Sequence, residues 1–247
     1  MRSRHHIMTA SMLCLALATA CGNVASIGMA RAPSTETPAG TPSGTSTGTS
    51  TGTSTGTQSG TPTKAAVPEG FNRVGSPANG LTVAVPKDWV ALDLTKGDLD
   101  QTLKQSGLSG QALEQAKRSL RPLVANKAIW ASDRASAATS PNKFATNLNG
   151  FCQDSPSTPP PVNRMITDIR GQLEQLGAKI SEAGEVRLDS GKAAIRVVYT
   201  LPSRGIQIRG TQYYVQAPGK TCIVTLSTDK DGQQALFDQI GRTTQLI

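Results

Sequence analysis

The sequence predicts an α+β protein, an antiparallel sheet covered by helices on both faces (an α-β-α sandwich). Short β-type segments separated by Gly and Pro turns fill the C-terminal half of the chain. Apolar residues at helical spacing occur before, between and after these segments. Strands joined by short turns pair antiparallel, and the helices must then bury their apolar sides on the sheet.

The first elements expected are a hairpin and two helices. Residues 81–85 and 90–94 both alternate between apolar and polar positions, and Pro86 lies in the turn between them. Leu residues at helical spacing indicate a short helix over 99–103. Ser109 is the expected N-cap of the second helix.

The later elements are mostly strands. We expect strands over 128–133, 144–151, 186–188, 193–201, 206–215 and 222–226, with the last four joined by turns at 189–191, 203–205 and 218–219. Apolar spacing predicts a helix over 166–176. A final helix should follow Asp231, which together with Gln234 resembles a capping box.

The N-terminal 20 residues form an export signal. A short basic start precedes an apolar segment over residues 7–20, which is too short to cross a bilayer as a helix. Cys21 directly follows the small residues Ala18-Thr19-Ala20. This arrangement resembles the bacterial lipobox, although Leu is commoner than Ala at the position of Ala18. The resemblance implies diacylglycerol on the Cys21 sulfur, cleavage before Cys21 and acylation, such as by palmitate, of the new amine. The alternative is a plain secretory signal with an incidental cysteine.

A tether is expected after the anchor. Residues 32–68 consist mainly of Thr, Ser, Gly and Pro, so this stretch has little apolar surface to bury and should be disordered. A flexible chain of about 45 residues spans roughly 35–40 Å root-mean-square. The predicted organisation is therefore a signal peptide (1–20), a lipidated Cys21 with its tether (21–66), and a globular domain (67–247). The predicted location is the outer face of the cell membrane or the cell surface.

Composition excludes several kinds of chemistry. Both histidines, His5 and His6, lie in the signal, so the mature chain cannot use Ser-His-Asp or Cys-His catalysis and lacks the commonest transition-metal ligand. We predict no catalytic residues, no metal and no cofactor. Basic residues exceed acidic ones, but they are spread along the chain and not interleaved with aromatic residues, so a nucleic-acid partner is not expected.

Four residues of the domain are candidate sites. Cys152 and Cys222 are its two cysteines, and export favours a disulfide between them over two buried thiols. Trp89 and Trp130 could contact a sugar or lipid ligand, although a core position is the commoner role of a Trp beside a strand end.

Several short motifs resemble known families. Residues 80–89, a strand followed by Pro and Trp, are similar to the opening of the PsbP-like (Mog/PsbP) domain. Residues 144–149, 176–177 and 191–193, followed by Tyr213-Tyr214, recur in the same order in the LpqN-type lipoproteins of actinobacteria. The resemblance implies a lipid-anchored α-β-α sandwich in a family without established catalytic residues.

The predicted function is that of a non-enzymatic accessory or binding lipoprotein, held in the membrane through Cys21. Its domain would be monomeric and would present a surface or shallow cleft to an envelope protein, lipid or glycan. One alternative is a carrier of a lipid or other apolar ligand, which requires a deep apolar pocket. Another is a hydrolase that uses no histidine.

Overall fold

The computed structural model describes residues 66–95, 99–105, 109–203 and 205–247. The predicted signal peptide, Cys21 and the tether up to residue 65 lie outside these ranges. Within them, none of the helices combines the length and the apolar character that a membrane span needs.

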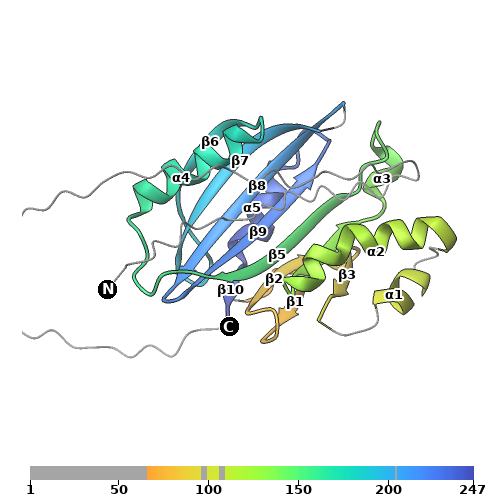
Figure 1. Cartoon of the computed structure of the whole chain (residues 1–247), viewed down its shortest axis with the longest axis horizontal. Coiled ribbons are helices and arrows are strands. Elements are labelled where there is room, and N and C mark those ends of the chain that lie inside the picture. The colour runs from red at the N-terminus through yellow and green to blue at the C-terminus, as the bar shows by residue number, and fades with distance from the viewer. Residues whose placement is uncertain (1–65, 96–98, 106–108, 204) are drawn as a thin grey trace, which may run out of the picture. The chain divides into compact units, whose positions relative to one another are not determined.

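The centre of the domain is a seven-stranded antiparallel sheet (Figure 1). Its strands follow the order β3-β4-β5-β9-β8-β7-β6. They are β3 (Val90–Asp93), β4 (Ile129–Asp133), β5 (Thr146–Asp154), β6 (Lys179–Arg187), β7 (Ala193–Ser203), β8 (Ile206–Ala217) and β9 (Lys220–Thr228). The three predicted turns connect β6 to β9 in succession, as expected from their Gly and Pro residues.

A second sheet has three strands, in the order β1-β2-β10. They are β1 (Phe71–Ser76), β2 (Leu81–Pro86) and β10 (Gln245–Leu246). The hairpin predicted between 81–85 and 90–94 is therefore wrong, because β2 pairs with β1 and β10 whereas β3 pairs with β4. The turn itself exists, since Trp89 N donates to Pro86 O at 3.1 Å. It carries the chain from one sheet into the other instead of reversing it within one sheet.

Helices cover both faces of the large sheet, as predicted. The helices are α1 (Leu99–Gln105), α2 (Gly110–Ala125), α3 (Ser136–Thr139), α4 (Val162–Gln175) and α5 (Gln234–Arg242). Apolar residues of α1, α2 and α4 share one core cluster with β7, and those of α5 share the other with β2. Figure 1 shows α4 in front of the sheet and α5 partly hidden behind β8 and β9. On the face that α5 covers, the structure differs from the predicted sandwich, because the three-stranded sheet covers part of that face in addition to the helix.

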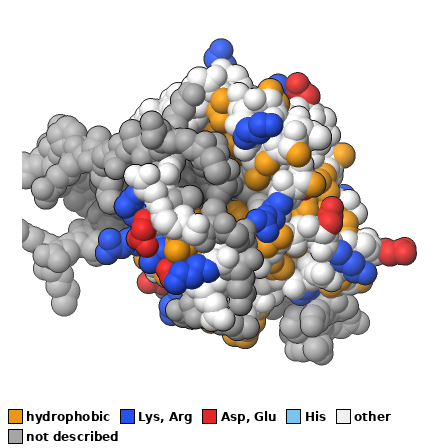
Figure 2. All heavy atoms as spheres, turned by 90° about the vertical axis from the view of Figure 1, so that its right-hand side faces the viewer, with side chains coloured by type: hydrophobic (Ala, Val, Ile, Leu, Met, Phe, Trp, Pro, Cys, Tyr) orange, Lys and Arg blue, Asp and Glu red, His pale blue; other side chains and the backbone are white. Residues whose placement is uncertain are grey.

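Charged side chains are dispersed over the surface seen in Figure 2. Lysine and arginine side chains lie among acidic, apolar and polar ones on that face. On α2, Lys117 pairs with Asp100 at 2.8 Å and with Glu114 at 3.0 Å. These exposed pairs partly neutralise the basic side of α2 and stabilise it only weakly.

Candidate functional site

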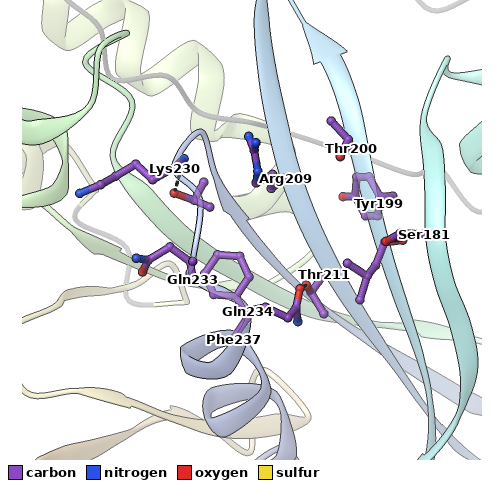
Figure 3. Close-up of a pocket in the computed structure, with 12 residues that line it drawn as sticks. Ser181, Tyr199, Thr200, Arg209, Thr211, Lys230, Gln233, Gln234 and Phe237 are labelled. Atoms are coloured by element: carbon purple, nitrogen blue, oxygen red, sulfur yellow. Dashed lines mark hydrogen bonds between the residues drawn. The ribbon is translucent and has the colours of Figure 1, made fainter.

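A pocket of about 270 Å³ lies on the α5 face of the large sheet, next to the first turn of α5 (Figure 3). The floor comes from β7, β8 and β9, and includes Thr200, Arg209 and Thr228. Another side of the pocket is formed by Lys230, Gly232, Gln233, Gln234 and Phe237. The pocket therefore joins strands of the sheet to the segment that leads into α5.

Strand register explains why the floor residues meet. Arg209 on β8 lies opposite Thr200 on β7 and opposite Thr228 on β9. Residues directly opposite each other in a sheet project from the same face, and their side chains are neighbours. The three side chains therefore form one polar row across three strands.

Hydrogen bonds fix most of the hydroxyl groups around this row. Thr211 Oγ1 donates to Gln234 Oε1 at 3.1 Å, which ties β8 to the first residue of α5. The hydroxyl oxygens of Thr228 and Thr146 lie 2.9 Å apart. The buried hydroxyls of Thr211 and Thr228 are thus already satisfied by partners within the protein.

The charges of the lining are those of Arg209 and Lys230. Asp and Glu are not among the described residues that line this pocket. Arg209 pairs with Asp231, whose side chain is 87% exposed. Lys230 Nζ donates to Thr139 Oγ1 at 2.5 Å. The pocket therefore offers positive charge and hydroxyl groups instead of an acid–base pair.

The ion pair of Asp231 also corrects a prediction. Helix α5 begins at Gln234, with Gln233 as the N-cap residue and without a side-chain capping bond. The predicted capping box is therefore wrong, because the Asp231 carboxylate contacts Arg209 and not the helix end. Ser109 does occupy the N-cap position of α2, but its hydroxyl makes no capping bond either.

A buried polar cluster holds α5 in place beside the pocket. Asp238 on α5 accepts hydrogen bonds from Arg196 Nε at 2.7 Å, Tyr213 OH at 2.8 Å and Gln234 Nε2 at 2.9 Å. Arg196 is only 8% exposed and also pairs with Glu182 at 2.7 Å. The cluster fixes the helix that carries Gln234 and Phe237, and so it sets the shape of the pocket.

Two pKa values in this cluster are displaced. Burial opposes the charged form of Arg196, but hydrogen bonds to Asp238 and Glu182 outweigh it and raise the pKa of Arg196. Burial, followed by the hydrogen bond to Asp238, raises the pKa of Tyr213. The cluster therefore contains a charged guanidinium and a neutral phenol at neutral pH.

The two tryptophans are not brought together. Trp89 packs in the core cluster of α5, and Trp130 packs in the cluster of α2 and α4. They are 7% and 9% exposed, and neither lines the pocket. These positions agree with the core interpretation. Trp130 Nε1 is buried, and no hydrogen-bond partner lies among the described residues.

The cysteine pair is joined. Cys152 on β5 lies directly opposite Cys222 on β9, and the structure contains a disulfide between them. Cys222 is fully buried in the core cluster of α5. The bond connects neighbouring strands that are 70 residues apart in the sequence.

The described residues contain no cluster of three or more His, Cys, Asp or Glu side chains arranged to hold a metal ion. Arg209, Lys230 and the threonines of the pocket were not singled out from the sequence. Arg209 and the threonines lie in strands whose alternation indicates only a sheet face, and their grouping depends on the register and on the position of α5.

Comparison with known proteins gives a likeness of fold. No known family model matches this chain, and no curated protein matches it. The solution structure of the cyanobacterial PsbP protein CyanoP of Synechocystis is 15% identical; the match covers 78% of this chain and 98% of that one, with a TM-score of 0.45. The crystal structure of LpqN, which is involved in cell envelope biogenesis in Mycobacterium tuberculosis, is 14% identical. That match covers 71% of this chain and 90% of that one, with a TM-score of 0.40.

The structure is thus an α+β sandwich with PsbP-type and LpqN-type proteins among its structural neighbours. These are the two groups that the sequence motifs resemble. Identity and TM-score are low for both, so no functional argument rests on the likeness.

Proposed function

We propose that this protein is a non-enzymatic accessory or binding lipoprotein of the cell envelope. Acyl chains on Cys21 would hold it in the membrane, and the tether would carry the monomeric domain outward from the outer face of the membrane. The domain would bind an envelope protein, lipid or glycan. Two or three acyl chains on one residue exceed the marginal binding that a single myristoyl chain gives.

The observation that carries the proposal is the order of the segments. A short apolar signal, Cys21, a Thr- and Gly-rich stretch and one folded domain follow each other directly. Each segment has a physical role in a tethered module, and a cytoplasmic enzyme would need none of the first three. The polar pocket beside α5 supports binding, because it groups a cation and hydroxyls without a carboxylate among the residues that line it.

This pocket does not favour the two alternatives. A lipid carrier needs a deep apolar cavity, whereas this pocket is small and its lining is about half polar, with Arg209 in its floor. A carboxylate hydrolase needs two converging acids, and the lining contributes none. Turnover of an envelope glycan by the purified chain would contradict the proposal.

The anchor can be tested with a matched pair of cysteine variants. Cys21→Ala should release the protein from membranes or stop its maturation, because the thioether cannot form. Cys14→Ala is the control, since Cys14 lies within the signal and leaves with it. Membrane fractionation and mass spectrometry of the mature N-terminus give the readout. If Cys21→Ala fractionates and matures like the unchanged chain, the proposed location is wrong.

A further inference from the structure

We propose that the pocket beside α5 binds a phosphate-type oxyanion through Arg209, with Lys230 contributing at the rim. The phosphate could belong to a lipid headgroup or to a phosphorylated glycan. The inference names a ligand class for the pocket and takes its biological setting from the proposed function. The binding itself is a property of the folded domain.

Arg209 has the chemistry that phosphate recognition requires. Its guanidinium is planar and permanently charged, and it can donate two parallel hydrogen bonds to one oxyanion. It lies between Thr200 and Thr228 in the row across the three strands. The Thr228 hydroxyl is already bonded to Thr146 and to the amide of Lys230, so the open polar neighbour in this row is Thr200. Figure 3 shows Arg209 on the strand side of the pocket, facing the space bounded by the segment before α5.

The present partner of Arg209 is easily replaced. Asp231 lies in the connection between β9 and α5, next to Gly232, and 87% of its side chain is exposed. Exposed ion pairs contribute little to stability, because water screens them and two side chains lose freedom. A phosphate monoester carries more charge than one carboxylate and a phosphodiester carries as much, and both fit the same guanidinium. Asp231 therefore acts as a resident anion that the ligand displaces.

Lys230 would add charge after a change of rotamer. Its ammonium group donates to Thr139, and in Figure 3 the side chain extends away from Arg209. A lysine has a flexible four-carbon stem, so its ammonium can follow a ligand. Its contribution should accordingly be smaller than that of Arg209.

The pocket size limits the ligand. Its volume of about 270 Å³ is slightly below the roughly 300–1,000 Å³ of typical drug-sized sites. A phosphate with a glycerol or one sugar unit fits such a space, and an acyl chain would have to stay outside it. The inference therefore concerns a headgroup and not the transport of a whole lipid.

The test uses the full chain with Cys21→Ala, so that no lipid is attached. Glycerol 3-phosphate is titrated at constant ionic strength, with chloride as the comparison, while the backbone amide resonances of Gly232, Gln233 and Gln234, which line the pocket, are followed by NMR. Saturable binding of the phosphate alone is expected. Arg209→Gln should weaken it at least about tenfold, because a charged bidentate contact is lost. Lys230→Gln should weaken binding by about two- to fivefold, as expected of a charge at the rim.

Asp231→Asn gives a test in the opposite direction. It should strengthen binding by about two- to fivefold, because the competing carboxylate is removed. Arg242→Gln is the matched control, since Arg242 is exposed and pairs with Asp189 at 3.9 Å outside the pocket. Equal binding by Arg209→Gln in a folded chain, equal shifts with chloride, or weaker binding by Asp231→Asn would each overturn the inference.

Vesicles distinguish the two sources of phosphate. If phosphatidylglycerol vesicles displace glycerol 3-phosphate and phosphatidylcholine vesicles do not, the ligand is a lipid headgroup. If neither displaces it, a free or glycan phosphate is the ligand. Because the assay needs no anchor, its failure leaves the Cys21 result intact, and a failure at Cys21 leaves the pocket result intact.

Discussion

Replacing Asp238 with alanine should loosen α5 from the sheet. The carboxylate of Asp238 accepts two bonds from Arg196, at 2.7 and 3.0 Å, one from Tyr213 and one from Gln234. After the replacement, Arg196 keeps only its pair with Glu182, whose side chain is 64% exposed. The Tyr213 hydroxyl loses the acceptor described above. The substitution therefore leaves a buried charge and a buried hydroxyl without their main partner.

The expected loss is about 2–4 kcal/mol of the free energy of unfolding. Hydrogen bonds to charged groups contribute about 1.5–3 kcal/mol, and breaking a fully buried ion pair costs about 3–5 kcal/mol. We take a value between these ranges because the Asp238 side chain is 35% exposed. With a urea m-value of about 2 kcal/mol/M, the midpoint of unfolding should fall by about 1–2 M.

Urea unfolding followed by circular dichroism measures this shift. Asp168→Ala is the matched control, because Asp168 forms only an exposed pair with Arg164 at 3.9 Å on α4. Its effect should stay within about 0.5 kcal/mol. If Asp238→Ala lowers the midpoint no more than Asp168→Ala does, the polar cluster does not hold α5 and the reasoning fails.

Three other predictions concern the core. Gly241→Ala should destabilise by about 1–3 kcal/mol, since an added Cβ would lie 2.1 Å from the Tyr213 ring. Gly171→Ala, in the open part of another helix, should stabilise by about 0.5–1 kcal/mol; urea midpoints that move in the same direction would contradict this pair. The raised pKa of Tyr213 keeps the folded phenol neutral, so its stabilising contribution is complete below about pH 10 and is lost as the pH rises further. Above pH 10 the free energy of unfolding of Tyr213→Phe should therefore fall less steeply with pH than that of the unchanged protein, by up to about 1.4 kcal/mol per pH unit. Equal slopes for the two proteins would refute this. Reducing the Cys152–Cys222 bond, which closes a loop of 70 residues, should lower the free energy of unfolding by roughly 4 kcal/mol. A urea midpoint that stays the same after reduction would contradict this.

Local turn chemistry made the C-terminal strands predictable. Glycines at positions 191, 205 and 219 have φ values between +74° and +81°, which glycine adopts without strain. Each lies between two segments rich in β-branched and aromatic residues, so both the turns and the strands could be recognised. Strand β6 runs over Lys179–Arg187 and is much longer than the predicted 186–188. It is an edge strand with many exposed polar residues, and so its sequence shows little apolar alternation.

Long-range pairing could not be predicted in the same way. Strand β2 is buried at five consecutive positions, because both of its faces are covered. The sequence pattern therefore does not indicate which face of the strand packs against which neighbour. Its partners β1 and β10 come from opposite ends of the domain, and Gly75 interrupts the pattern of β1 with a φ of +98°. The pocket also depends on segments that are far apart in the sequence. Ser181, Arg209 and Lys230 meet only after β6, β8 and the segment before α5 are placed, and no local pattern indicates that placement.

The seam between β2 and β10 has a consequence for the order of folding. Gln245 and Leu246 lie opposite Thr82 and Leu81, and Ile247 N donates to Gly80 O at 3.0 Å. Contacts between such distant residues form slowly, because a long loop must close first. In a growing chain that has not yet reached residue 245, one edge of β2 has no partner strand. The three-stranded sheet can therefore be finished only after synthesis of these residues, and a fluorophore pair at residues 80 and 247 would time that last step.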